Sequence, residues 1–262
     1  MTATAVEMES EETLATQVST DRPSLLRLVG QPLACLAVVV GALVYVRVAD
    51  VSVPEQRQLG TANLLTLLGQ HLLISVIATA LVCLLAVPTG VLLTRGSARR
   101  FSKPIITVAG FGQAAPAIGL IALGAVVFGI GKFGAIAALT VYGLLPIIAN
   151  TVAGLDSVDR RLVEAARGMG MTGTATLLRV ELPLALPVII AGMRTALVLI
   201  VGTATLATFT GAGGLGSLIT VGITLQEHTV LVVGAILVAA LALFIDWLAR
   251  LVEIYAAARE GS

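Results

Sequence analysis

Two glycine-rich segments have the spacing that holds a dinucleotide in other proteins. Residues 211–216 and residues 168–173 both satisfy the pattern G-x-G-x-x-G. This pattern binds a pyrophosphate when it lies between a β-strand and a helix. Neither segment has that context, because the first follows a long apolar run and the second ends a short amphipathic stretch. We therefore predict no nicotinamide site, and we interpret residues 211–216 as a tight turn that lets backbone approach backbone. The glycines of this turn are Gly211, Gly213, Gly214 and Gly216.

Other patterns for chemistry are missing from the sequence. Gly131-Lys132 is followed by Phe133, so the phosphate-binding loop G-x-x-x-x-G-K-[ST] is not formed. His71 and His228 stand apart, without another His, Cys or carboxylate at the spacing of metal ligands. No set of nucleophile, base and orienting group can be assembled. The sequence predicts a chain that is not an enzyme and has no catalytic residue, metal or cofactor of its own.

The composition indicates which class of protein contains these glycine-rich segments. Of 262 residues, 57% are hydrophobic and 12% are charged, whereas soluble domains have about 45–50% apolar and about 25% charged residues. This excludes a cytosolic enzyme, a secreted disulfide scaffold and a disordered protein, and it predicts an all-α integral membrane protein. The net charge of +1 offers no broad basic surface for nucleic acid.

Six apolar runs are long enough to cross a bilayer core, which is about 30 Å thick. We predict six transmembrane helices, with Gly and Pro tolerated because neighbouring helices satisfy the freed backbone groups. Most Lys and Arg residues of the connections then lie on one side, which places both termini in the cytoplasm. The acidic start of the chain is interpreted as a cytoplasmic tail and not as a secretory signal. The runs are residues 28–46, 71–93, 105–130, 133–153, 184–210 and 229–248.

Two charged residues fall within these runs. Arg194 lies in the fifth run, and Asp246 lies near the cytoplasmic end of the sixth. An ionised arginine at this depth costs at least about 2.5 kcal/mol unless it reaches the interface or pairs. Our hypothesis is that Arg194 pairs with Asp246, or reaches Glu181, and that this pair braces two helices.

The loop between the fourth and fifth runs, residues 154–183, contains a short amphipathic pattern. Val158, Leu162 and Met169 recur at helical spacing with an alanine between the last two, and Gly168 and Gly170 then end the helix. The pattern alone leaves two interpretations open. The apolar face lies on the bilayer or on the bundle itself, or it docks a soluble partner as a helix in a groove.

The same loop carries a family motif. Glu164-Ala165-Ala166 is followed by three intervening residues and Gly170, and then by nine intervening residues and Val180-Glu181-Leu182-Pro183. This spacing resembles the EAA loop of ABC importer permeases, although that family usually has Ile where this chain has Val180. A narrower resemblance covers most of residues 64–228 and is to the permease subunits of osmoprotectant importers, which carry glycine betaine, choline and carnitine.

The resemblance implies a MetI-like permease fold with a cytoplasmic coupling helix that docks on an ATPase. Glu164 is then expected to make polar contacts with the ATPase, and Gly170 to turn the chain. The glycines of residues 211–216 come to lie at the outer mouth of the pathway, where a gating role is expected. The residues assigned to ATPase coupling are Glu164, Ala165, Ala166, Gly170, Leu182 and Pro183.

The family also implies partners and a location. We expect a separate ATPase subunit that holds ATP and Mg, an extracytoplasmic solute-binding protein, and a second permease chain that is either a copy or a paralogue. The chain would lie in a bacterial or archaeal cytoplasmic membrane. The expected parts are a tail (1–27), a first helix with an outer loop (28–63), the permease core (64–250) and a C-terminal tail (251–262).

Three other functions compete with this interpretation. An ion-coupled transporter or channel would need acidic residues deep in the spans, and Asp246 is the one candidate. A membrane-embedded enzyme or assembly factor would need a polar cluster at one depth, and none is visible. A permease for another amino acid or amine is the closest alternative. The aromatic residues are scattered and form no evident cage for a quaternary amine, which places selectivity mainly in the solute-binding protein.

Overall fold

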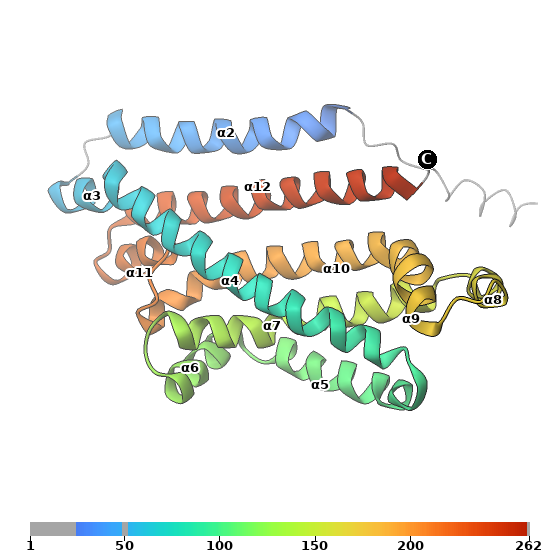
Figure 1. Ribbon diagram of the computed structural model, residues 1–262. Helices are drawn as coiled ribbons and strands as arrows, with labels where there is room; N and C mark the ends of the chain where they lie inside the picture. Colours follow the sequence, from blue (N-terminus) through green and yellow to red (C-terminus); the bar gives the residue numbers. More distant parts are fainter. Residues whose placement is uncertain (1–24, 49–51, 261–262) are drawn as a thin grey trace, which may run out of the picture.

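The computed structural model describes residues 25–48 and 52–260, and every element in these ranges is helical. The long helices lie side by side in an elongated bundle, with α4 crossing the others at an angle (Figure 1). The predicted tail of residues 1–27 lies largely outside the described residues. The elements are α2 (Leu25–Val48), α3 (Val53–Gln58), α4 (Thr61–Leu93), η1 (Gly96–Phe101), α5 (Ser102–Ala114), α6 (Ala117–Phe128), α7 (Lys132–Asp156), α8 (Arg160–Gly168), α9 (Gly173–Thr176), η2 (Leu177–Glu181), α10 (Leu182–Thr203), η3 (Ala204–Thr210), α11 (Gly216–Thr224) and α12 (His228–Glu260).

Five helical segments of the described chain are long and apolar enough to cross a membrane. They are α2, α4, α7, the run from α9 to η3, and α12. The predicted third span, residues 105–130, is not one helix, because α5 and α6 meet at a bend of 96°. Pro116 precedes α6, and Ala115 before it is extended (φ −64°, ψ 143°). A residue before proline avoids the helical region, which favours a break at this position.

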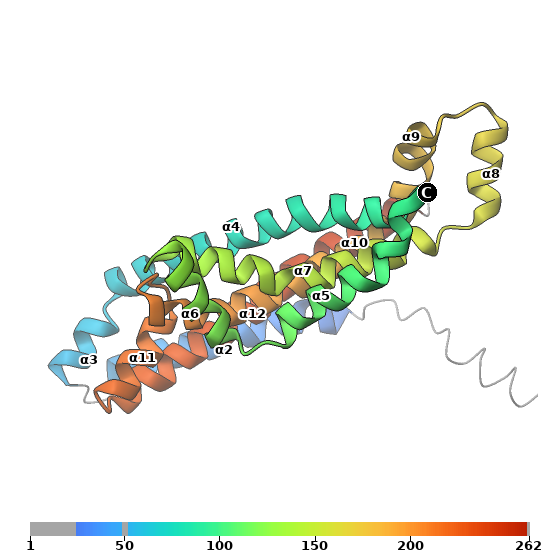
Figure 2. The ribbon, with the colours of Figure 1, turned by 90° about the horizontal axis from the view of Figure 1, so that it is seen from below.

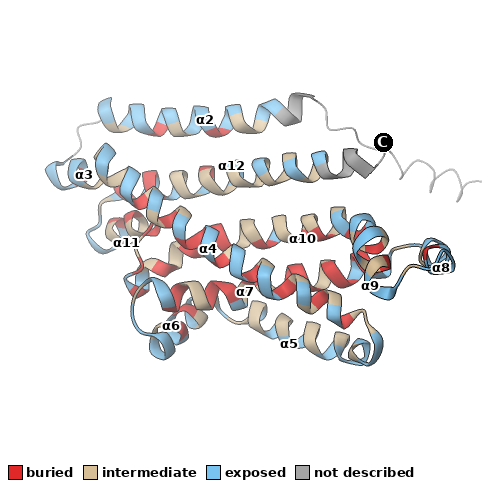
Figure 3. Cartoon of the chain, viewed as in Figure 1, coloured by how far each residue is buried: buried red, intermediate tan, exposed pale blue. Residues whose placement is uncertain are grey.

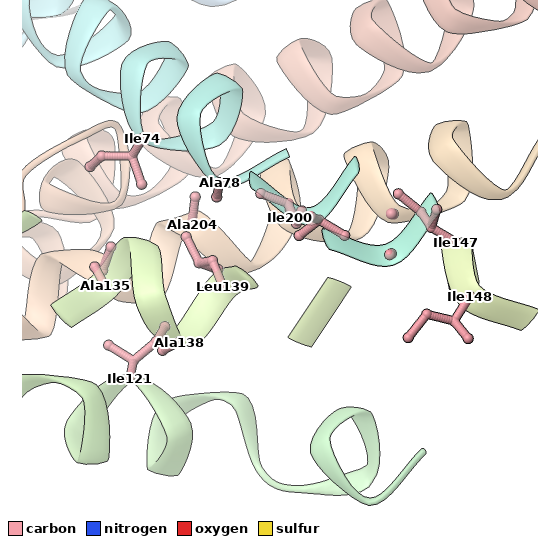
Figure 4. Packing of buried hydrophobic residues seen from close by; sticks show 14 of the residues in the cluster. Ile74, Ala78, Ile121, Ala135, Ala138, Leu139, Ile147, Ile148, Ile200 and Ala204 are labelled. Atoms are coloured by element: carbon pink, nitrogen blue, oxygen red, sulfur yellow. The ribbon is translucent and has the colours of Figure 1, made fainter. Parts of the chain in front are cut away.

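Helix α7 lies at the centre of the bundle and packs against α4, α5, α6 and α10. Its inner face contributes Leu139 and Ile147 to a buried cluster that also contains Ile74 of α4 and Ile200 of α10 (Figure 4). Small residues let the helices approach closely. A Cβ on Gly192 of α10 would lie 2.9 Å from the Pro146 carbonyl oxygen and 2.6 Å from Asn150 Cβ of α7, so glycine is required at this crossing. Small residues at helix contacts are typical of membrane bundles, where packing drives association.

Helix α2 is peripheral. It packs along α12 (Figure 1), and only 11% of its most apolar 18-residue segment is buried. Its outer surface is therefore almost entirely exposed in Figure 3, in contrast to α7. This apolar surface suits contact with lipid. At the other end of the chain, residues 251–260, predicted as part of a tail, continue α12.

The loop between α7 and α10 projects from one end of the bundle. Figure 2 shows α8 standing away from the long helices, with α9 between it and the bundle. Helix α11 lies at the opposite end. The two segments singled out in the sequence, residues 154–183 and residues 211–216, are therefore at opposite ends of the same bundle.

Candidate coupling loop and glycine turn

Helix α8 begins and ends with recognisable caps. Asp159 is the N-cap, and its Oδ1 accepts a hydrogen bond from the Arg161 amide at 2.9 Å. At the other end the Gly170 amide donates to the Arg167 carbonyl at 2.9 Å, and the Met171 amide donates to the Ala166 carbonyl at 3.2 Å. This pair of bonds is the Schellman arrangement. It needs a left-handed residue, and Gly170 has φ +85°. Gly170 thus ends the helix.

The residues of the EAA sequence lie on two different faces of α8. Ala166 is 2% exposed, and α8 packs against α9 and η2 of the same loop. Glu164 and Ala165 are exposed, and so are the apolar side chains of Leu162 and Met169, at 49% and 75%. Val158 packs on the end of the bundle, whereas Leu162 and Met169 stay exposed, so the choice between the bilayer and a soluble partner for these two side chains stays a prediction. The short α8 offers an exposed surface that combines apolar, alanine and acidic groups.

The base of the loop contains one turn of π-helix. Thr172 caps α9 through its Oγ1, which accepts from the Ala175 amide at 3.3 Å. Residues Leu177–Glu181 then form η2, and the Leu182 amide bonds the Leu177 carbonyl five residues earlier. Pro183 follows, and proline has no amide hydrogen to continue the α-helical pattern. Leu182 packs on the buried cluster of Leu155, Ala185 and Ile189, which seats α10 on the end of α7.

Glu181, at the end of η2, does not reach Arg194. Its two carboxylate oxygens accept from both guanidinium Nη atoms of Arg95, at 3.0 and 2.5 Å. The Glu181 side chain is 7% exposed and the Arg95 side chain 31%. Sequence reasoning missed this partner, because Arg95 is one of several basic residues in the connection after α4.

Arg194 instead joins α10 to α12. Its Nε lies 2.8 Å from Asp246 Oδ1 and its Nη2 lies 3.0 Å from Asp246 Oδ2, so the expected pair is present. A second carboxylate, Glu253, accepts from Arg194 Nη1 at 2.9 Å. Gln31 of α2 donates to the Leu243 carbonyl at 3.0 Å beside this group. Glu253 follows Asp246 by two helical turns and so lies on the same face of α12.

At the opposite end, the glycine turn packs on α4. The Gly214 amide donates to Gln70 Oε1 at 3.0 Å, and a Cβ on Gly213 would collide with the same Gln70 amide group. Gly213 and Gly214 also have positive φ, +82° and +94°. His71 is fully buried under Gly214, and its Nε2 lies 2.9 Å from the Val201 carbonyl, so Nε2 must carry the hydrogen. A side chain at either position would strain the backbone, and it would displace Gln70 at position 213 or crowd His71 at position 214.

The other glycines of this turn have similar constraints. Gly211 ends η3 with φ +70°. A Cβ on Gly216 would collide with the Thr205 carbonyl. Both G-x-G-x-x-G segments lie between helices, residues 168–173 between α8 and α9 and residues 211–216 between η3 and α11. In the described residues no three His, Cys, Asp or Glu side chains are grouped as metal ligands.

These features define a class of protein. It is an all-helical, multi-pass membrane protein with an exposed amphipathic helix at one end and a closely packed glycine turn at the other. Residues 86–254 match the family described as the binding-protein-dependent transport system inner membrane component. The chain therefore belongs to this family, the permease subunits of ABC importers.

Relatives of known name share much of the sequence. The chain is 40% identical over 196 residues to the glycine betaine/carnitine/choline transport system permease protein OpuCB of Bacillus subtilis, covering 75% of this chain and 89% of that protein. It is 41% identical over 186 residues to the osmoprotectant import permease protein OsmY of Salmonella typhimurium, covering 71% and 79%. A solved structure of the MetNI methionine ABC transporter, in an inward-facing conformation, matches with a TM-score of 0.65 and 23% identity, covering 79% of this chain and 99% of that chain. This last similarity confirms the expected permease fold.

Proposed function

We propose that this chain is the permease subunit of an ATP-driven importer for osmoprotectants such as glycine betaine, choline or carnitine. The observation that carries the proposal is the exposed face of α8, which bears the EAA sequence at one end of a bundle of membrane helices. The similarity to named osmoprotectant permeases supports the substrate class. In this proposal α8 docks in a cleft of a separate ATPase subunit, which holds ATP and Mg.

Each of the six residues assigned to ATPase coupling has a role in this docking. Glu164 meets polar groups of the ATPase, and Ala165 lets the two surfaces approach closely because it is small. Ala166 is buried and holds α8 against the rest of the loop. Gly170 gives the left-handed turn, and Leu182 with Pro183 fixes where α10 begins. Movement of the ATPase then moves the loop as a unit.

The remaining partners follow from the same proposal. Two permease chains enclose the pathway, and an extracytoplasmic binding protein delivers the solute to the end that contains the glycine turn. The α8 end faces the cytoplasm, and so do both termini. Residues 211–216 act at the mouth of the pathway as part of its gate. The binding protein supplies most of the selectivity for a quaternary amine.

Purification of the native complex tests this function. The tagged chain is solubilised gently from its own membrane, and the proteins that accompany it are identified. An ATPase with a phosphate-binding loop and a solute-binding protein are expected. The binding protein is then titrated with glycine betaine, choline, carnitine and a panel of amino acids. Tight binding of a quaternary amine supports the proposal, whereas tight binding of an amino acid alone assigns the chain to an importer of that solute.

A chain that is reproducibly purified alone and well folded contradicts the dependence on partners. Transport in vesicles with an imposed ion gradient and no ATP then distinguishes an ion-coupled transporter. A matched variant makes the first experiment sharper. Glu164→Gln changes the exposed face of α8, whereas Glu227→Gln alters a carboxylate at the opposite end, just before α12. Only the first is expected to reduce the amount of ATPase recovered.

A further inference from the structure

The ion pair between Arg95 and Glu181 connects two elements that are far apart in the sequence. Arg95 follows the last residue of α4 by two positions, and Glu181 ends the π-turn at the base of the α8 loop. The contact is bidentate, with Nη1 to Oε1 at 3.0 Å and Nη2 to Oε2 at 2.5 Å. Two parallel bonds fix orientation as well as distance. The loop therefore cannot shift relative to the end of α4 without breaking or carrying this pair.

Burial makes the pair costly to break. Glu181 is 7% exposed, so its carboxylate has little access to water if Arg95 moves away. An unpaired buried charge is strongly destabilising, whereas an exposed pair contributes little. Arg99 and Asp156 form such an exposed pair nearby, at 3.0 Å, with side chains 58% and 41% exposed. The same region thus contains one buried Arg–carboxylate pair, Arg95–Glu181, that is costly to break and one exposed Arg–carboxylate pair, Arg99–Asp156, that contributes little to stability.

The other end of α4 holds the glycine turn. Gln70 accepts from the Gly214 amide, and His71 lies beneath the same glycine. From Gln70 to Leu93 the helix is continuous, a distance of about 35 Å at 1.5 Å per residue. Figure 2 shows α4 extending from the α3 end of the bundle toward the α8 and α9 end. A displacement of one end of such a helix displaces the other end.

We propose that Arg95 and Glu181 are the positioning residues through which movement of the α8 loop reaches α4 and, along it, the glycine turn. The inference rests on the proposed function, in which an ATPase moves α8. The π-turn supports it, because this rare geometry occurs frequently at functional sites and here places Glu181 at Arg95. Without this ion pair, the ATPase still docks and hydrolyses ATP, but its movement is transmitted less completely to the glycine turn.

The test measures the coupling ratio of the purified complex in proteoliposomes. Import of radiolabelled glycine betaine is divided by ATP hydrolysed, for the wild type and for Glu181→Gln, Arg95→Gln and the exchange Arg95→Glu/Glu181→Arg. We expect the ratio to fall about tenfold in each single variant, which corresponds to about 1.4 kcal/mol of lost coupling. Arg95→Gln is expected to be the more severe, because it leaves the buried Glu181 unpaired. The exchange variant is expected to recover most of the ratio, and Arg99→Gln to retain it fully.

A second measurement follows the glycine turn directly. Phe209, just before the turn, is 57% exposed. We therefore expect a cysteine at this position to react with a membrane-impermeant maleimide in a chain whose Cys35 and Cys83 are replaced by Ala. Mg-ATP is expected to change the labelling rate in the wild-type background but not with Glu181→Gln. This measurement requires the ATPase but no imported solute.

The outcomes separate the two proposals. If the wild-type complex imports none of glycine betaine, choline and carnitine, the proposed substrate class is wrong, and the labelling response to Mg-ATP still decides whether the ion pair transmits movement. If no ATPase accompanies the wild type, both proposals are wrong. If Glu181→Gln and Arg95→Gln have the coupling ratio and labelling response of Arg99→Gln, the link has no part in transmission. Failure of the exchange variant to recover, with normal assembly, also contradicts a role based on this ion pair.

Discussion

Replacing Asp246 with Asn removes one of the two carboxylates that neutralise Arg194 between α10 and α12. Arg194 donates two hydrogen bonds to Asp246, at 2.8 and 3.0 Å, and a third to Glu253 at 2.9 Å. Breaking a buried pair outright costs about 3–5 kcal/mol. Because Glu253 still balances the charge, we expect Asp246→Asn alone to lower the free energy of unfolding by about 1.5 kcal/mol. Glu253→Gln is expected to cost about 1 kcal/mol, since Asp246 keeps both of its bonds.

The double variant is the informative one. With both carboxylates neutral, Arg194 stays ionised within a membrane helix, and we expect a loss of about 4 kcal/mol. The excess over the two single changes is then about 1.5 kcal/mol, within the usual range for residues of one network. The assay is unfolding of the purified chain in mixed micelles by increasing SDS, followed by circular dichroism. Asp156→Asn, in an exposed pair, serves as the control and is expected to change stability by less than about 1 kcal/mol.

Strict additivity would refute this reasoning. If the double variant loses only the sum of the single losses, within about 0.5 kcal/mol, the two carboxylates act independently and do not share the arginine. A further check is Arg194→Met. It removes the charge itself, so that adding it to the Asp246→Asn/Glu253→Gln variant is expected to recover part of the lost stability.

Three shorter predictions concern the glycines and the buried alanine. Gly170→Val forces a β-branched residue to φ +85° and is expected to abolish recovery of the ATPase with the tagged chain, whereas Gly168→Ala, with open space at its Cβ, is expected to leave recovery unchanged. Gly213→Ala places a methyl group against Gln70 and is expected to reduce import in proteoliposomes by at least about tenfold, because the turn moves off α4 at a cost of about 1–3 kcal/mol. Recovery of import by adding Gln70→Ala would confirm the collision, and wild-type import by Gly213→Ala would contradict it. Ala166→Leu overfills a buried position and is expected to lower recovery of the ATPase without reducing the amount of chain in the membrane, which an immunoblot of the two fractions measures.

Uninterrupted apolar runs allowed the sequence to locate most of the membrane helices. The run at residues 133–153 corresponds closely to α7, which covers Lys132–Asp156. The break at Ala115 was not predictable from the proline alone, because Pro88, Pro146 and Pro187 lie inside continuous helices. The conformation before each proline depends on what neighbouring helices can satisfy. Hydropathy therefore finds a span without showing whether it is straight.

The candidate site was predicted in part. The cost of an ionised arginine in a membrane helix predicts a carboxylate partner, and Asp246 is that partner. Glu253 was missed because hydropathy assigned it to a tail, although its seven-residue spacing from Asp246 places both on one helical face. The Arg95–Glu181 pair was missed for another reason. Arg95 and Glu181 are 86 positions apart in the sequence, and only tertiary packing brings them together. No local pattern distinguishes Arg95 from Arg99.

The sharp bend between α5 and α6 also determines what surrounds this part of the chain. At the bend, Pro116 has no amide hydrogen, and the last carbonyls of α5 and the first amides of α6 have no helical partners. Hydrocarbon cannot satisfy such groups, so irregular backbone at membrane depth is tolerated only against protein or water. Gln113, partly exposed beside the bend, adds a polar side chain to the same place. We therefore expect water or a second protein chain to cover this side of the bundle, and lipid to contact other sides, such as the exposed apolar surface of α2.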